Sequence, residues 1–213
     1  MSQESLWSQR YRDVGDDYLF GTAPNRFLAH RAELLRLGRS ALAVADGEGR
    51  NSVWLAEQGL DVTAIEISAT AVEKARRLAA GRGAHVRFIL GDMLSADWPP
   101  PPLTAAFDWV IGIFIQFAGP AERERQFAAM KRATRPGGRI LLQGYTPKQL
   151  DYRTGGPSAV ENLYTAPLLR DAFADWTVEE LVDYEDDIVE GTGHRGRSAL
   201  IGLVAKKPSG VTG

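Results

Sequence analysis

The sequence predicts a Rossmann-like α/β fold: a doubly wound, mostly parallel sheet of seven strands, with helices on both faces and an antiparallel last strand. Two observations carry this prediction. Short apolar runs alternate with amphipathic stretches through most of the 213 residues, which is typical of a parallel sheet covered by helices. The last two apolar runs are separated only by a loop, so we expect them to pair antiparallel.

The first half of the chain is expected to start with a helix over residues 23–37, which has a leucine-rich face and ends at Gly38. Residues 42–45 are apolar throughout, as expected of a strand buried on both faces. Residues 52–58 are amphipathic and are followed by Gly59, a common helix stop.

The next strand and helix meet at an acid and a capping residue. Residues 62–67 form an apolar run that carries Glu66 near its end. Ser68 is a good N-cap for a helix whose apolar face reaches Leu78. Residues 86–90 follow as a third strand.

The second half repeats the alternation before the closing strands. The expected elements are a strand within 107–117, a helix over 121–134, a strand over 139–143 after the turn 136–138, a short helix over 165–173, and strands over 176–188 and 198–205.

Composition limits the functions to consider. The net charge of −2 gives no general attraction for a phosphate backbone, so nucleic acid is not an expected partner. The absence of cysteine excludes disulfides, thiolate metal sites and thiol nucleophiles. The histidines and acids show no spacing typical of metal ligands, so no metal is expected. The polar start and the lack of a long apolar stretch predict no signal peptide and no membrane span, hence a cytoplasmic location.

We expect a single domain over residues 1–207 and a disordered tail over 208–213. Residues 1–38 are expected to act as a lid, because Trp7, Tyr11 and two further aromatic residues precede the first strand. An alternative for Trp7 is an ordinary amphipathic helix packed on the sheet.

The most informative segment is Asp46-Gly47-Glu48-Gly49, an acidic, glycine-rich turn between a strand and a helix. Glycines let the backbone approach a ligand closely, and the N–H groups that begin a helix point toward it. Glu66, near the end of the next strand, is placed to bind a ribose diol. We therefore expect a nucleoside at this edge of the sheet.

Charge indicates which nucleoside. A dinucleotide fingerprint requires glycine where Ser52 stands, and Asp46 would repel a pyrophosphate. An acid suits a cationic group, such as the amino acid part of S-adenosylmethionine. Asp46 has an alternative role as a helix cap. A nicotinamide-dependent oxidoreductase and a non-catalytic nucleoside-binding module remain as alternative functions.

Several further segments resemble class I S-adenosylmethionine-dependent methyltransferases. They are Ala43 to Asn51, Gly91-Asp92-Met93, Phe107-Asp108 and Arg135-Pro136-Gly137-Gly138. Within that class, the segments at 7–11, 20–25, 145–147, 155–157 and 163–165 resemble the tellurite-resistance-type small-molecule subgroup. The resemblance implies S-adenosylmethionine as cofactor, a small-molecule methyl acceptor, and direct in-line transfer of the methyl group. It gives no reading of the acceptor's identity or of the oligomeric state.

The residues and the resemblance together define the candidate site. The expected cofactor-binding residues are Ala45, Asp46, Gly47, Glu48, Gly49, Asn51, Glu66, Ile67, Ser68, Gly91, Asp92, Met93, Leu94, Ile113, Phe114, Phe20, Gly21 and Asn25. The expected acceptor pocket consists of Tyr11, Gln116, Tyr145, Tyr152, Arg153 and Arg195.

His194 is the candidate general base, because an imidazole titrates near neutral pH. It lies in the glycine-rich segment 190–197, which we expect to be a loop at the ligand-binding edge if the sixth strand is parallel. The alternative is a solvated loop histidine.

Overall fold

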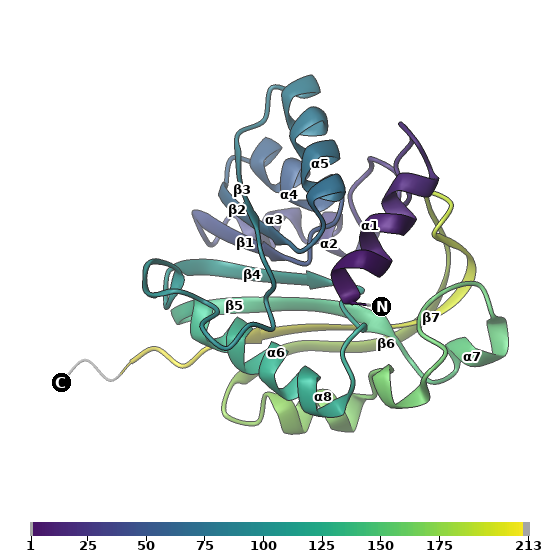
Figure 1. Ribbon diagram of the computed structural model, residues 1–213. Coiled ribbons are helices and arrows are strands. Elements are labelled where there is room, and N and C mark those ends of the chain that lie inside the picture. The colour runs from purple at the N-terminus through teal and green to yellow at the C-terminus, as the bar shows by residue number, and fades with distance from the viewer. Residues whose placement is uncertain (1, 211–213) are drawn as a thin grey trace.

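A computed structural model describes residues 2–210 and shows one seven-stranded sheet with helices on both faces (Figure 1). The strand order is β3-β2-β1-β4-β5-β7-β6, and only β7 runs against the others. This confirms the predicted fold class. The strands are β1 (Ser40–Val44), β2 (Asp61–Glu66), β3 (Val86–Leu90), β4 (Phe107–Ile113), β5 (Thr134–Tyr145), β6 (Thr177–Glu190) and β7 (His194–Lys206).

Helices cover both faces because successive side chains of a buried strand point to opposite sides. In β4, Trp109 and Ile111 pack in one apolar cluster with Phe27 and Leu55, whereas Val110 joins the opposite cluster. The helices are α1 (Gln3–Asp13), α2 (Arg26–Ala29), α3 (Ala32–Leu35), α4 (Arg50–Glu57), α5 (Ala69–Gly81), α6 (Pro120–Ala133), α7 (Gln149–Tyr152) and α8 (Ala166–Ala172), with 3-10 turns at Pro101–Leu103 and Val160–Asn162.

The N-terminal region differs from the prediction in two ways. Gln3–Asp13 forms helix α1, and the expected helix over 23–37 is split into α2 and α3. The split occurs at Arg31, whose N–H bonds the carbonyl of Leu28 while its guanidinium donates to the carbonyl of Phe27. The same guanidinium pairs with Glu180 on β6, so a contact between distant parts of the chain interrupts the helix.

The closing strands are longer than predicted. The segment 190–197 is not a loop, because β6 continues to Glu190 and β7 begins at His194. The connection is therefore only residues 191–193. The turn expected at 136–138 lies within β5, where the pairing with β4 shifts register.

Two further predictions concern the ends of the chain and the membrane. Residues 208–210 belong to no helix or strand, and the rest of the predicted tail, 211–213, lies outside the described residues. Among residues 2–210, no helix combines the length and the apolar character needed to cross a bilayer.

Candidate active site

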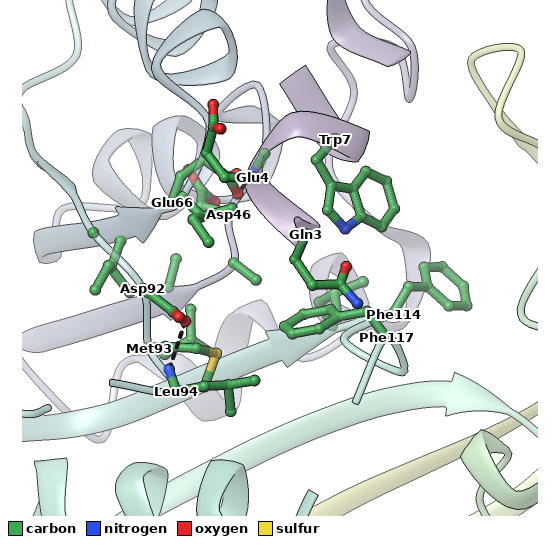
Figure 2. Close-up of a pocket in the computed structure, with 18 of the residues that line it drawn as sticks. Gln3, Glu4, Trp7, Asp46, Glu66, Asp92, Met93, Leu94, Phe114 and Phe117 are labelled. Carbon is green, nitrogen blue, oxygen red and sulfur yellow. Dashed lines mark hydrogen bonds between the residues drawn. The ribbon is translucent and has the colours of Figure 1, made fainter. Parts of the chain in front are cut away.

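A cavity of about 360 Å³ lies at the carboxyl ends of β1, β2, β3 and β4. This is the edge at which open parallel sheets bind ligands. Figure 2 shows Asp46 and Glu66 on one part of its wall, Asp92, Met93 and Leu94 on another, and Trp7 of α1 with Phe114 and Phe117 nearby. Further lining residues are Ser2, Gln3, Glu4, Tyr11, Phe20, Ala43, Val44, Ala45, Gly47, Arg50, Asn51, Ile65, Ile67, Gly91, Ile111, Ile113, Glu122, Arg125 and His194.

The turn from β1 to α4 brings the backbone into the cavity wall. Gly47 has a φ of 64°, and a Cβ atom there would lie 2.9 Å from the Tyr11 hydroxyl. Ala45 has a φ of 46°, although this left-handed region disfavours residues with a Cβ. Phe114, after β4, has a φ of 55°. Such strain is concentrated at functional sites, and here two strained residues lie on one cavity wall.

Asp46 lines the cavity and also binds the start of α4. Its carboxylate accepts hydrogen bonds from the N–H (3.3 Å) and the hydroxyl (2.5 Å) of Ser52. The alternative capping role is therefore realised together with a position on the wall. Burial raises the pKa of Asp46 to about 7 despite the bonds from Ser52.

Glu66 connects the two neighbouring turns. Its carboxylate accepts the Gly47 N–H and the Ser68 N–H, each at 2.9 Å. Burial raises its pKa, opposed by these backbone donors. A carboxylate has about four acceptor sites, so hydroxyl donors of a ribose can be added to these two bonds.

The segment after β3 forms a third part of the wall. Asp92 accepts the Leu94 N–H at 2.8 Å, which fixes a tight turn. Met93 is buried, and Ile67 lies on the same cavity wall. Apolar side chains in this position suit the flat face of a base.

Five expected cofactor residues do not line the cavity. Glu48 points toward Lys74 beneath α1, and Gly49 packs against Ala75 of α5. The Ser68 hydroxyl caps α5 and bonds Ser8 of α1. The other two are Gly21, which lies against Gly191, and Asn25, which is buried in a polar network.

That network surrounds His194. The Glu190 carboxylate accepts from Arg50 Nη2 (2.6 Å) and Asn25 Nδ2 (2.8 Å), and its Oε2 lies 3.7 Å from His194 Nδ1. Although burial raises the pKa of Glu190, His194 and Arg50 lower it to about 2. The His194 ring packs against the rings of Phe20 and Phe114, with centroids 4.5 and 4.4 Å away.

His194 is therefore a largely buried strand residue, with its side chain 12% exposed, rather than a solvated loop histidine. Burial lowers its pKa, and the nearby Glu190 opposes this shift. The lowered pKa favours the neutral form of the imidazole, which can accept a proton.

Most of the expected acceptor residues lie elsewhere. Tyr11 lines the cavity, whereas Gln116 bonds the backbone of β5 and Tyr145 is buried behind Phe114. The remaining three do not line the cavity: Tyr152 bonds Glu185, and Arg153 and Arg195 are exposed. Strand alternation explains Arg195, because it follows His194 in β7 and so points to the opposite face.

Phe107-Asp108, part of the resemblance, lies at the opposite end of β4 from the cavity. There Asp108 accepts the N–H groups of Arg39 (2.7 Å) and Ser40 (3.0 Å) and pairs with Arg135. These backbone bonds lower its pKa, against the effect of burial. Asp108 therefore holds the start of β1 and is far from the candidate site.

Several residues of the cavity wall are not among those expected from the sequence. Arg50 was overlooked although it follows Gly49 and begins α4. Its place after the glycine-rich turn was a usable signal. Gln3 and Glu4 reach the cavity only because α1 folds over it, and no local pattern reveals that contact.

Comparisons with known proteins agree with this geometry. Residues 41–138 match the profile of a family described as "Methyltransferase domain". A demethylmenaquinone methyltransferase from Thermus thermophilus is 31% identical over 108 residues, which cover 50% of this chain and 47% of that protein. A second, from Renibacterium salmoninarum, is 29% identical over 133 residues, 62% and 49% of the two chains. The chain thus spans about half the length of the curated relatives it matches.

Solved structures share the fold over nearly the whole chain. One, from work on the conversion of a disulfide bond into a thioacetal group during echinomycin biosynthesis, has a TM-score of 0.81 at 19% identity and covers 99% of this chain and 94% of its own. TehB from Haemophilus influenzae has a TM-score of 0.69 at 18% identity, with 96% and 66% covered. Magnesium protoporphyrin IX methyltransferase from Synechocystis, with bound SAH, has a TM-score of 0.67 at 15% identity, with 96% and 95% covered.

Residues 41–138 are therefore similar to a methyltransferase domain, and both curated relatives are methyltransferases by name. The profile match supports S-adenosylmethionine as the cofactor. At these identities, the solved structures show the fold alone.

Proposed function

We propose that this chain transfers a methyl group from S-adenosylmethionine to a small molecule. The observation that carries the proposal is the cavity at the carboxyl edge of the sheet, where Asp46, Gly47 and Glu66 lie within the segment that matches a methyltransferase domain. Asp46 and Glu66 offer carboxylates that can bind ammonium and hydroxyl groups. Gly47 has no side chain, so a ligand can approach its backbone closely.

The residues fit the cofactor in chemistry as well as in position. Glu66 has acceptor sites left for a ribose, and Met93 and Ile67 present apolar surface for a base. Asp46 supplies a carboxylate for the amino acid end. Bound S-adenosylmethionine carries a methyl group already activated on a sulfonium, so alignment and a dry site supply most of the catalysis.

The acceptor side of the site is aromatic. Trp7, Tyr11, Phe20, Phe114 and Phe117 line the cavity together with His194. These rings exclude water from the reacting atoms and suit an acceptor with an apolar body. When the acceptor arrives protonated, the neutral imidazole of His194 takes its proton.

A direct assay tests the proposal. Purified protein is incubated with S-adenosylmethionine and a panel of acceptors, and S-adenosylhomocysteine is measured. The panel contains small phenols, quinols, thiols and amines, with tellurite included because of the resemblance of the sequence. We expect one class of acceptor to stimulate the release of S-adenosylhomocysteine.

Binding separates the alternatives. Calorimetric titration is expected to show affinity for S-adenosylhomocysteine and none for NADH. The reverse result would indicate an oxidoreductase. Strong binding of S-adenosylhomocysteine without turnover on any acceptor would indicate a non-catalytic module.

The role of His194 has its own test. His194→Ala is expected to leave the affinity for S-adenosylhomocysteine unchanged and to slow turnover on a protonated acceptor. Turnover equal to that of the unmodified protein would remove the proposed base.

A further inference from the structure

The closing hairpin places an acid directly opposite His194. Glu190 of β6 pairs with His194 of β7 across the three-residue connection 191–193. Opposed residues of an antiparallel pair project from the same face of a sheet, so the carboxylate and the imidazole lie side by side. Oε2 of Glu190 is 3.7 Å from His194 Nδ1. This distance exceeds a hydrogen bond, as is common for catalytic pairs before a substrate binds.

Other residues fix the position of this carboxylate. Glu190 is only 6% exposed; its Oε2 accepts from Arg50 Nη2 at 2.6 Å and its Oε1 accepts from Asn25 Nδ2 at 2.8 Å. The same Asn25 nitrogen also donates to Gln143 Oε1 at 2.6 Å. Against the effect of burial, His194 and Arg50 lower the pKa of Glu190 to about 2. The group beside His194 is therefore a fixed, ionised carboxylate at neutral pH.

The ring of His194 is also held in one orientation. It packs between Phe20 and Phe114, with centroids 4.5 and 4.4 Å away. Its Nδ1 is buried and has no hydrogen-bond partner among residues 2–210, whereas the side chain as a whole lines the cavity. The accessible part of the ring therefore excludes Nδ1. A carboxylate repels a bare nitrogen lone pair and attracts an N–H group, so Glu190 favours a proton on Nδ1.

We propose that Glu190 is a positioning residue that holds His194 in the Nδ1–H tautomer, with the lone pair of Nε2 presented to the methyl acceptor. The part played by Nε2 rests on the proposed function. Nε2 takes the proton of an acceptor O–H, N–H or S–H group, and the electron pair of the acceptor forms a bond to the methyl carbon. The bond from that carbon to sulfur breaks, and its electron pair stays on sulfur. Glu190 stabilises the protonated imidazole until its proton passes to water.

The other charges around His194 explain why an acid is needed there. Arg50 of α4 and Arg10 of α1 act on the imidazole through their positive charge, and Tyr145 of β5 packs against the ring edge-on. Burial and the two arginines lower the pKa of His194, whereas Glu190 raises it. Without Glu190, the imidazole would be a weaker base beside two cations.

NMR of protein with ¹⁵N-labelled histidine measures the tautomer directly, without any ligand. The chain has three histidines, and the signal lost in His194→Ala identifies His194. We expect the proton on Nδ1 in the unmodified protein, although free histidine in water favours Nε2–H. Arg50→Met combined with Glu190→Leu removes the ion pair without leaving a buried charge. In this double variant, the proton is expected to move to Nε2.

A single substitution tests the charge of the acid. Glu190→Gln keeps the shape and an oxygen for Arg50, and it is expected to lower the measured pKa of His194 by about one unit or more. Glu185→Gln is the matched control, because it is the same change in the same strand, at an acid that pairs with Lys148 and Arg197. This control is expected to change neither the tautomer nor the titration of His194.

Turnover links the tautomer to catalysis. On an acceptor with a hydroxyl proton, Glu190→Gln is expected to lower kcat about ten-fold or more at neutral pH, because the base is weaker and less well oriented. The rise of kcat with pH is expected to move to lower pH, which a purely structural role of Glu190 would not cause.

Two results would overturn the positioning role. One is an Nε2–H tautomer of His194 in the unmodified protein, and the other is an Nδ1–H tautomer that persists in the double variant. If the double variant does not fold, the titration of Glu190→Gln decides, and an unchanged pKa of His194 rejects the role. A tautomer that depends on Glu190, together with an unchanged kcat in Glu190→Gln, would instead remove His194 as the base in the proposed function. The two failures are therefore distinguishable.

Discussion

The carboxyl group of Asp46 serves the fold and lines the cavity at the same time. It caps α4 through Ser52, and burial raises its pKa to about 7. The sequence indicated contact with the cofactor and capping of the helix as alternatives, and the structure shows the capping bonds together with a place on the cavity wall. The charge of the cavity therefore changes near neutral pH, an effect that depends on three-dimensional burial and has no local sequence signal.

This titration predicts a pH-dependent affinity. Ionised Asp46 attracts the ammonium group of S-adenosylhomocysteine, so binding favours the deprotonated acid. Affinity is expected to rise with pH below about 7, by up to about ten-fold per pH unit, and then to level off. Calorimetry between pH 5.5 and 8 measures this rise, and Asp46→Asn is expected to flatten it. A slope that persists in Asp46→Asn would assign the titration to another group.

Glu66 gives a second prediction for a single residue. Glu66→Gln is expected to weaken the binding of S-adenosylhomocysteine about ten-fold or more. The variant loses charged hydrogen bonds to the hydroxyl groups of the ligand and to one of its two backbone donors. The matched control is Glu57→Gln on α4, away from the cavity. Calorimetry decides, and equal affinities of the two variants would place the ribose elsewhere.

Among the elements, α1 shows where local patterns fail. The sequence left Trp7 either in a lid or in a helix packed on the sheet. The structure gives a helix that lies on the cavity wall and is bound to α5. Its position depends on Lys74, a buried lysine whose Nζ donates to the carbonyls of Tyr11 and Asp17, each at 2.7 Å, and pairs with Glu48 at 3.0 Å.

Loosening this attachment is expected to open α1. Lys74→Met combined with Glu48→Gln removes the three bonds without leaving a buried charge. Backbone amides in Gln3–Asp13 are expected to exchange hydrogen faster, and S-adenosylhomocysteine to dissociate faster, because the wall opens more often.

Hydrogen exchange and stopped-flow release measure the two effects. Lys131→Met is the control, because Lys131 pairs with Asp175 far from α1. Unchanged exchange in α1 would show that Lys74 does not hold it.

At the scale of the whole molecule, the alternation of apolar and amphipathic runs was sufficient to predict the sheet and most of the helices that cover it, and a cavity lies at the edge where we expect the ligand. The hairpin of β6 and β7 is longer than predicted, because the parts of both strands nearest the tip are acidic or glycine-rich and do not look like strand in the sequence. Their extended form depends on pairing across the hairpin, such as Glu190 with His194. Because of this pairing, His194 lines the cavity and Arg195 does not.

The hairpin tip closes the site against the N-terminal segment. The N–H groups of Thr192 and Gly193 both donate to the carbonyl of Leu19, at 3.0 and 2.9 Å. Gly191, at the same tip, has a φ of 62°, and a Cβ atom there would lie 2.3 Å from the Leu19 oxygen and 2.5 Å from the Gly21 nitrogen. The backbone of residues 191–193 is therefore in direct contact with the backbone of residues 19–21.

This closure predicts a specific effect of Gly191→Ala. The added methyl is expected to separate the tip from residues 19–21, which displaces Phe20 and His194 from the cavity wall. Gly83→Ala is the matched control, since Gly83 also has a φ of 62° but no atom within 4 Å of its would-be Cβ. Backbone strain of about 1 kcal/mol is then common to both variants.

Urea unfolding and calorimetry separate strain from closure. Gly83→Ala is expected to lose about 1 kcal/mol of unfolding free energy, and Gly191→Ala is expected to lose more than that. Only Gly191→Ala is expected to bind S-adenosylhomocysteine more weakly, because the segment carrying Phe20 and the strand carrying His194 are both part of the cavity wall. If the two variants matched in stability and in affinity, the hairpin tip would have no part in closing the site, and the N-terminal segment would be held over the cavity by α5 alone.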